Sequence, residues 1–350
     1  MPLGRRTAGD YGEVERLRAA AAPLEGARIL HLSAAGSRLR SPEILPSLLS
    51  LYEDLGVHAE HMVLAGERPF WRLTRQLEDG LQGGETAISD ETWDEYLEDS
   101  PAPEGFDGIV VHGPGALASA SKAGTPYAFR CELDYSSPDQ PMWNRLEPLI
   151  TTTADLPEAI DPLAPASVDL PVKLAGSMVR SLGVDLARPT VFQARPFDTW
   201  QDPHEVLDAF AIAKQQAPGL QLVLAGDPPT DDVEAWRLVR ELSDYSETKE
   251  DLLLLTGIGD VELNALRAIA RAGVESSLAK GAELTTLETL WKGTPVVDAA
   301  DAPEAIVELV KDPGLAIELG EAGRARVREH HLITHLAENE LRLLASFQST

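Results

Sequence analysis

The chain has 350 residues, which is long enough for two domains of ordinary size. Hydrophobic residues make up 43% and charged residues 25% of the sequence, a composition typical of a folded globular protein. Acidic residues outnumber basic ones by 57 to 30, so the formal net charge is −27. This charge argues against a nucleic acid or an anionic membrane as partner, because both would be repelled by the average surface.

The single cysteine, Cys131, excludes an internal disulfide bond and a cysteine-based zinc site. No stretch approaches 18 uninterrupted apolar residues, so we expect no membrane-spanning helix. Two arginines near the start are not followed by an apolar segment, so we expect no secretory signal and a cytoplasmic location. Phosphate-loop, zinc-protease and nucleophile-elbow patterns are absent from the sequence, and we expect no metal and no cofactor.

In the first half of the chain, short apolar runs alternate with amphipathic stretches. The expected strands are 27–34, 58–66, 106–115 and 125–134, and the expected helices are 42–56 and 89–99. Strands separated by helices are typical of a parallel, doubly wound α/β sheet.

The second half repeats this alternation after a segment rich in Pro and Asp, 159–171, which we expect to join two domains. The expected strands are 188–198, 220–227 and 295–297, and the expected helices are 202–219, 261–273, 303–312 and 321–330. Two similar α/β halves favour an arrangement of two Rossmann-like domains.

Four phrases occur together in a characteristic order. They are CELDYSSPDQPMW (131–143), FDTWQDPHEVLDAF (197–210), LVLAGDPPTDD (222–232) and LETLWKGTPVV (287–297). In this combination, together with the final helix 327–347, the sequence resembles the trehalose-forming glycosyltransferases, which are retaining, nucleotide-sugar-dependent enzymes of the GT4 group with the GT-B fold. The resemblance covers nearly the whole chain.

The resemblance implies an α/β protein of GT-B architecture, with two Rossmann-like domains whose parallel sheets face each other across a cleft. Residues 1–165 would form the acceptor-side domain, and residues 166–330 would bind a donor such as UDP- or ADP-glucose. Residues 331–350 would form a helix that packs back on the N-terminal domain. Such enzymes need no metal, so protein cations and helix N-termini have to hold the departing diphosphate.

The segment expected to hold this diphosphate departs from the family pattern, S-R-F-D-x-W-K-D-P. Pro196 and Gln201 stand where the family has its Arg and Lys. If the two losses are independent, they cost roughly 10⁴–10⁶ in rate, because one such donor is typically worth 10²–10³. Arg195, one position earlier, and Trp200 remain candidates for contact with the sugar nucleotide. On a strand, the shift by one residue turns the Arg195 side chain to the other face of the sheet. In a loop, the side chain could still reach the diphosphate.

A second departure concerns the family's paired glutamates, E-x7-E, which bind the donor sugar and the nucleotide ribose. Lys280 replaces the first glutamate, and Glu288 matches the second. Glu288 is also explained as an acidic residue favoured near the start of a helix. Gly226 and Thr285 are further candidates for the sugar-nucleotide site.

The N-terminal half keeps only part of the expected acceptor side. After the first strand, Arg38 and Arg40 follow a single glycine where the family has a run of glycines, so bulky side chains should close the approach to the diphosphate. Both arginines are also candidate phosphate donors. His112 and Asp134 match residues that line the family's sugar pocket. A histidine at a strand end is more often a hydrogen-bonded structural residue, and an Asp that caps a turn explains Asp134 equally.

The sequence therefore leaves three functions open, and the enzyme activity is uncertain. The favoured hypothesis is a pseudo-glycosyltransferase with a binding or regulatory role, in which Asp134 and Glu288 are remnants of the catalytic set. The alternative is an active retaining enzyme that makes trehalose or a related glucoside from a nucleotide sugar. The expected partners are a second copy of this chain or an active homologue, and the expected ligand is a sugar or sugar nucleotide. A third hypothesis is a sugar-phosphate sensor that uses Lys280, Arg38 and Arg40.

Overall fold

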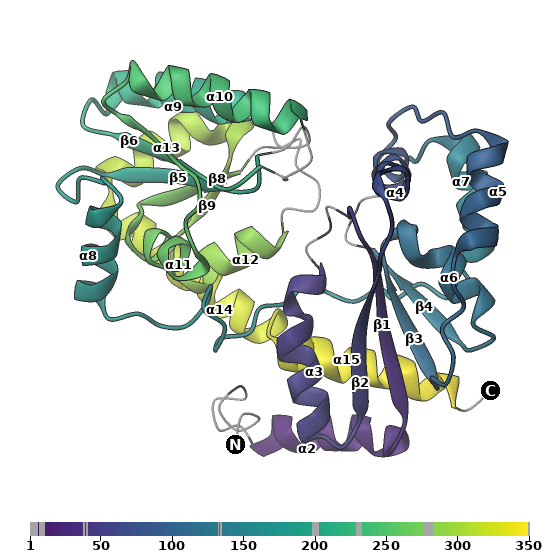
Figure 1. The fold of residues 1–350 in the computed structure, drawn as a ribbon. Helices are drawn as coiled ribbons and strands as arrows, with labels where there is room; N and C mark the ends of the chain where they lie inside the picture. The colour runs from purple at the N-terminus through teal and green to yellow at the C-terminus, as the bar shows by residue number, and fades with distance from the viewer. Residues whose placement is uncertain are drawn as a thin grey trace. The chain divides into compact units, whose positions relative to one another are not determined.

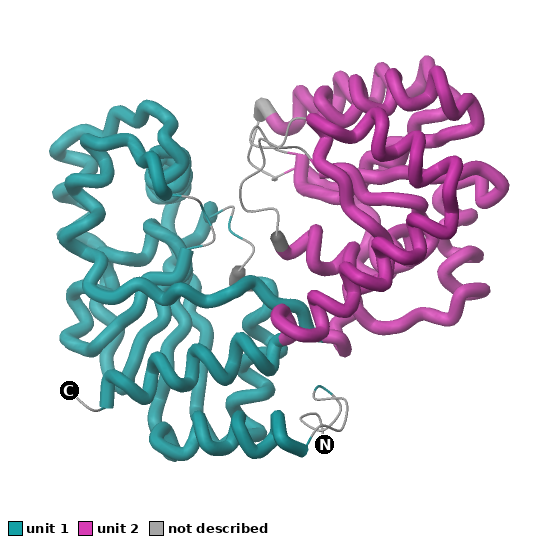
Figure 2. The backbone as a smooth tube through the Cα atoms, turned by 180° about the vertical axis from the view of Figure 1, so that it is seen from behind, with its two compact units in different colours: residues 1–161, 333–350 teal, residues 162–332 magenta. Residues whose placement is uncertain are grey.

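A computed structural model describes residues 6, 11–37, 39, 41–131, 133, 135–197, 203–228, 233–275 and 283–348. The chain divides into two compact units (Figure 2). Unit 1 comprises Met1–Asp161 and Ile333–Thr350, and unit 2 comprises Pro162–Leu332. The last helix therefore belongs to the unit that contains the start of the chain.

Unit 1 is built on a parallel sheet of four strands in the order β2-β1-β3-β4. The strands are β1 (Arg28–Ala34), β2 (His58–Leu64), β3 (Gly108–His112) and β4 (Tyr127–Arg130). The helices are α2 (Tyr11–Ala21), α3 (Leu45–Asp54), α4 (Arg68–Leu81), α5 (Asp90–Asp99), α6 (Leu117–Lys122), α7 (Gln140–Leu146) and α15 (Ile333–Phe347). The central strand β3 is buried along its whole length, as its Ile-Val-Val run predicts for a parallel strand covered on both faces.

Helices α2, α3 and α15 share one hydrophobic core with the sheet of unit 1 (Figure 1). Leu17 of α2, Leu48 of α3 and Leu341 of α15 are all fully buried in it. The backbone N–H of Ile333 donates a hydrogen bond of 2.9 Å to the carbonyl of Ile160, which ties the start of α15 to the end of the first segment of unit 1. The C-terminal helix is thus part of the core of unit 1.

Unit 2 is built on a parallel sheet of five strands in the order β7-β6-β5-β8-β9. The strands are β5 (Thr190–Ala194), β6 (Gln221–Ala225), β7 (Leu252–Leu255), β8 (Ala272–Glu275) and β9 (Val296–Asp298). The helices are α8 (Val172–Ser181), α9 (Pro203–Gln216), α10 (Val233–Glu247), α11 (Asp260–Ile269), α12 (Glu283–Trp291), α13 (Ala302–Lys311) and α14 (Pro313–His330).

Alternate residues of the central strands of unit 2 enter two different cores. Val191 and Leu222 pack with residues of α9, α10 and α13, whereas their neighbours Phe192 and Val223 pack with residues of α8 and α11. Because successive side chains of a strand point to opposite faces, helices have to cover both faces of this sheet. The α/β class with parallel sheets that the sequence predicts is confirmed.

Several element boundaries differ from the sequence-based expectation. The helix expected at 261–273 ends at Ile269, because residues 272–275 form β8 between β5 and β9. The strand expected to reach residue 134 ends at Arg130. Strand β7 is not expected from the pattern, because a short run of leucines fits a buried helix as well as a buried strand.

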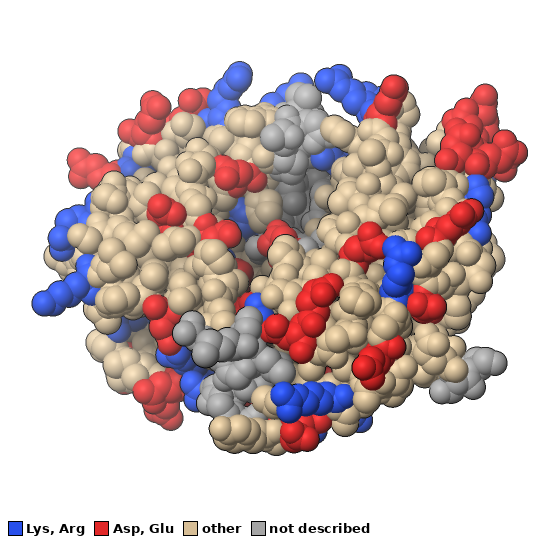
Figure 3. All heavy atoms as spheres, turned by 60° about the horizontal axis from the view of Figure 1, so that its bottom comes forward, with Lys and Arg blue, Asp and Glu red and all other residues tan. Residues whose placement is uncertain are grey.

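Acidic side chains are spread over the face of the molecule in Figure 3, with lysines and arginines placed among them. This distribution fits the net charge of −27. Within the described ranges, no helix combines the length and the apolar character that crossing a bilayer requires.

We predict that Leu341→Ala lowers the free energy of unfolding by about 2–5 kcal/mol, because it leaves a cavity in the core shared by α2, α3 and α15. Urea denaturation measures the loss, and hydrogen exchange locates it in β1 and β3. The exposed neighbour Arg342→Ala is the control and should cost less than about 1 kcal/mol. Equal stability of the two variants would contradict a core role for α15.

Candidate functional site

The strand order of unit 2 indicates where a ligand should bind. From β5 the chain adds β6 and β7 on one side of the sheet, and then returns to add β8 and β9 on the other. In open parallel sheets, ligands bind at the carboxyl ends of the strands where this order reverses. That place lies between β5 and β8, so the candidate site of unit 2 begins with the residues at the ends of these two strands.

A buried ion pair occupies this position. Arg195 directly follows β5, Glu275 is the last residue of β8, and Nε of Arg195 donates to Oε2 of Glu275. The side chains are only 3% and 12% exposed. The cation at the reversal point is therefore neutralised by a carboxylate from the neighbouring strand, and that carboxylate would repel a phosphate approaching it.

Gly226 follows β6 and allows the chain to pass close to Arg195. A Cβ atom added at Gly226 would lie 1.7 Å from the carbonyl oxygen of Arg195, which no side chain permits. The N–H of Arg195 donates to the carbonyl of Ala225 at 2.9 Å, and the N–H of Gly226 donates to the carbonyl of Leu255 at 3.0 Å. Packing between adjacent strand ends thus accounts for a glycine at this position.

Glu288 and Thr285 lie on α12 and are both buried. Oε2 of Glu288 lies 2.6 Å from Nη2 of Arg267 on α11, and the two side chains are 7% and 2% exposed. The backbone carbonyl of Thr285 accepts a hydrogen bond of 2.9 Å from the hydroxyl of Thr289. The carboxylate of Glu288 is therefore held by a cation inside unit 2.

In unit 1 the strand order reverses between β1 and β3, and two buried histidines lie on these strands. Nδ1 of His31 and Nε2 of His112 are 3.1 Å apart. Nε2 of His31 is 3.5 Å from Oε1 of Glu340 on α15, and the hydroxyl of Tyr52 donates to the same oxygen at 2.6 Å. Arg130 extends the network, with Nη1 lying 4.0 Å from Oε2 of Glu340 and Nη2 lying 3.3 Å from Oε1 of Glu158.

Burial controls protonation in this network. It lowers the pKa of His31 and lowers that of His112 well below its ordinary value, while it raises the pKa of the Tyr52 hydroxyl. Both histidines are therefore neutral at neutral pH, and one ring nitrogen donates while the other accepts. His112 is a buried member of a polar network that ties the sheet of unit 1 to α15.

The segment after β1 in unit 1 is closely packed. Leu39 is buried, and its Cδ1 atom would lie 2.4 Å from a Cβ added at Gly113. Gly36 has a positive φ of 84°, and a Cβ at this position would lie 2.8 Å from Cα of Trp71. The remaining predicted site residues, which lie outside the described part of the chain, are Arg38, Arg40, Asp134, Trp200 and Lys280.

The partners of the predicted residues are missing from the sequence-based prediction. Glu275, Arg267 and His31 pair with Arg195, Glu288 and His112 respectively. Glu275 could have been identified from the sequence, because it is a charged residue at the end of a short apolar run. Arg267 could not have been identified in this way, because an arginine on an amphipathic helix is ordinarily solvated.

Two solved glycosyltransferase structures share this fold over nearly the whole chain. The sucrose-phosphate synthase of Thermosynechococcus elongatus superposes with a TM-score of 0.65 at 16% identity, covering 92% of this chain and 99% of that one. An E. coli trehalose-6-phosphate structure bound with UDP-2-fluoro glucose gives a TM-score of 0.65 at 12% identity, covering 91% and 99%. The chain therefore has the GT-B fold.

Sequence comparison narrows this class to one family. The model of the trehalose synthase N-terminal domain matches residues 42–156. The trehalose synthase of Rubrobacter xylanophilus is 30% identical over 391 residues, which covers 96% of this chain and 93% of the relative. The chain belongs to the trehalose synthase family, as the resemblance of its motifs predicts.

We predict that Glu288→Gln lowers the free energy of unfolding by about 3–5 kcal/mol, because it leaves the buried guanidinium of Arg267 without its charged partner. Chemical denaturation measures the change. Glu308→Gln on the exposed side of α13 is the control and should have little effect. The double variant Arg267→Met with Glu288→Leu should recover most of the stability. If Glu288→Gln is as stable as the parent, the pair does not hold α11 to α12.

We also predict that stability falls as the pH is lowered through about 6.5, the ordinary pKa of histidine. Because the folded-state pKa values of His31 and His112 are lowered, the unfolded chain takes up protons that the folded chain does not. The free energy of unfolding should then decrease by up to about 1.4 kcal/mol per pH unit for each histidine. In His112→Gln the slope between pH 6.5 and 5 should be shallower, and parallel curves for the two proteins would refute this assignment.

Proposed function

We propose that this member of the trehalose synthase family does not transfer glucose from a nucleotide sugar, and that it acts as a binding or regulatory protein on a retained GT-B scaffold. The observation that carries the proposal is the buried ion pair between Arg195 and Glu275 at the reversal point of the sheet in unit 2. A donor diphosphate would need uncompensated positive charge there.

The electrostatic requirement follows from the reaction of the family. As the bond between the sugar and the nucleotide breaks, negative charge develops on the departing diphosphate, and without a metal the protein has to neutralise it. Pro196 and Gln201 supply no charge at the two positions where the family has Arg and Lys. Arg195 is the nearest substitute, but Glu275 already holds it.

The buried ion pair of Glu288 with Arg267 supports the same proposal. In the family, the matching glutamate contacts the ribose of the donor. Here its carboxylate is 2.6 Å from the guanidinium of Arg267, and both side chains are buried. Turning Glu288 toward a ribose would separate a buried ion pair, and removing one partner of such a pair typically costs about 3–5 kcal/mol.

The length of the chain adds a third argument. The alignment with the Rubrobacter xylanophilus relative spans 391 positions, more than the 350 residues of this chain, so the relative contains segments that this chain lacks. After β9 this chain enters the helical turn Ala299–Asp301 and then α13 at once. The resemblance places a glycine-rich loop and a further strand here, and both help to cover the nucleotide in the family.

The cores of both units are well packed although the expected cleft residues differ, as expected where folding is retained and the chemistry is not. The partners that fit this role are a second copy of the chain or an active homologous glycosyltransferase. A sugar bound without turnover is the ligand that suits the retained fold.

Calorimetry with UDP-, ADP- and GDP-glucose tests the proposal, followed by an assay for trehalose after addition of glucose. We expect no binding at millimolar donor and no product, while the Rubrobacter xylanophilus trehalose synthase serves as the active control. Trehalose formation at a rate within about a hundredfold of that control would overturn the proposal, because one missing donor alone costs about that much.

A gain-of-function variant tests whether the missing cations and the carboxylate of Glu275 prevent donor binding. Pro196→Arg, Gln201→Lys and Glu275→Gln together restore the two cations of the family and remove the opposing carboxylate. We expect this variant to bind at least one of the three donors about tenfold more tightly than the parent. Unchanged donor binding in a folded variant would show that the loss has another origin.

A further inference from the structure

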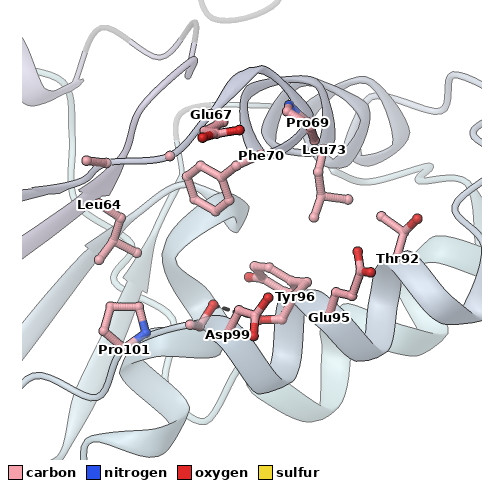
Figure 4. Close-up of a pocket in the computed structure, with 13 residues that line it drawn as sticks. Leu64, Glu67, Pro69, Phe70, Leu73, Thr92, Glu95, Tyr96, Asp99 and Pro101 are labelled. Carbon is pink, nitrogen blue, oxygen red and sulfur yellow. Dashed lines mark hydrogen bonds between the residues drawn. The ribbon is translucent and has the colours of Figure 1, made fainter.

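Unit 1 contains a pocket of 300 Å³ between α4 and α5, close to the end of β2 (Figure 4). Its walls come from two helices that face each other across the cavity. Phe70 and Leu73 of α4 lie on one side, and Thr92, Glu95 and Tyr96 of α5 lie on the other. A pocket of this volume accommodates a small organic molecule.

The interior of the pocket is apolar and aromatic. Leu73 and Tyr96 are buried, whereas Phe70 is half-buried. The hydroxyl of Tyr96 donates to the carbonyl of Pro114 at 2.8 Å and accepts from the N–H of Ala118 at 3.0 Å. Its hydrogen-bonding capacity is therefore used away from the cavity, and its ring faces the empty space together with that of Phe70.

A glycine makes room for one of these rings. A Cβ atom at Gly66 would lie 2.4 Å from Cδ1 of Phe70, so the ring packs directly on the glycine backbone. The position of the aromatic wall therefore depends on the absence of a side chain at residue 66.

Three carboxylates border this apolar interior, namely those of Glu67, Glu95 and Asp99. None of the three makes an ion pair or a side-chain hydrogen bond within the described part of the chain, and no Lys or Arg is among the residues that line the pocket. On α6, Nζ of Lys122 donates to the backbone carbonyls of Leu97, Glu98 and Ser100 and is not engaged with these carboxylates.

The placement of two of these carboxylates is unfavourable for the helix that carries them. Glu95 and Asp99 are four residues apart on α5, so their like charges lie on the same face of the helix and repel each other. Asp99 is also the last residue of α5, where the helix dipole disfavours negative charge. A cation bound between the two helices would relieve both effects.

We propose that this pocket binds a small organic cation, an ammonium or guanidinium group carried on an aryl or alkyl body. The charged group meets the carboxylates of Glu67, Glu95 and Asp99 at the rim, and the apolar body fills the space between Phe70 and Tyr96. The aromatic faces add a cation–π attraction when the charge lies above them. Phosphates and nucleotide sugars are repelled by the same rim, so this site is separate from the donor chemistry discussed above.

Calorimetry on the full chain at low salt, with phenethylamine, hexylamine and butylguanidine as probes, tests the proposal. We expect at least one probe to bind, with an affinity that falls as salt is added. The neutral analogue 2-phenylethanol and the anionic analogue 3-phenylpropionate should bind much more weakly. If none of the three cations binds, or if 2-phenylethanol binds as well as phenethylamine, the proposal is wrong.

Two double variants locate the site. Glu95→Gln with Asp99→Asn removes two of the rim charges and should weaken cation binding roughly tenfold. Asp94→Asn with Glu98→Gln removes the same charges from neighbouring exposed positions that do not line the pocket, and should leave the affinity nearly unchanged. Equal loss in both variants would mean that the cations bind to the acidic surface in general.

Phe70→Ala should weaken binding of phenethylamine without abolishing folding, since its ring is only partly buried.

Discussion

One ion pair between neighbouring strand ends joins the two sides of the sheet of unit 2 at the point where its strand order reverses. The strand order places the ends of β5 and β8 side by side, and Arg195 and Glu275 occupy them. Because Arg195 is buried and the side chain of Glu275 is only 12% exposed, the attraction between them is screened little by water or salt. A diphosphate would have to compete with a carboxylate that is already in place, and the neighbouring positions 196 and 201 contribute no cation.

Two further buried polar pairs involve candidate site residues. Glu288 is held by Arg267 in unit 2, and His112 is held by His31 in unit 1. In each case a residue that matches a functional position of the family is buried and bonded to a neighbouring element of its own unit. In unit 1, α15 has a polar contact with the sheet through Glu340 as well as its apolar core.

Much of the fold is predictable from the sequence, because short apolar runs mark most strands and a period of 3.6 marks most helices. The leucine run of β7 fits a buried helix as well as a strand, and the extent of the helix ending at Ile269 depends on the strand that follows it. The candidate residues Arg195, Glu288 and His112 are identified by motif. Their partners are not, because the adjacency of β5 to β8 and of α11 to α12 is a property of the topology, which the sequence pattern does not contain.

We propose that Arg195 is unavailable to a donor diphosphate because Glu275 already binds it. A crystal structure of the chain grown with saturating UDP-glucose tests this proposal. We expect the guanidinium of Arg195 to stay bonded to Glu275, with no diphosphate density at the ends of β5 and β8. A diphosphate bonded to Arg195, with the carboxylate of Glu275 turned away, would contradict it.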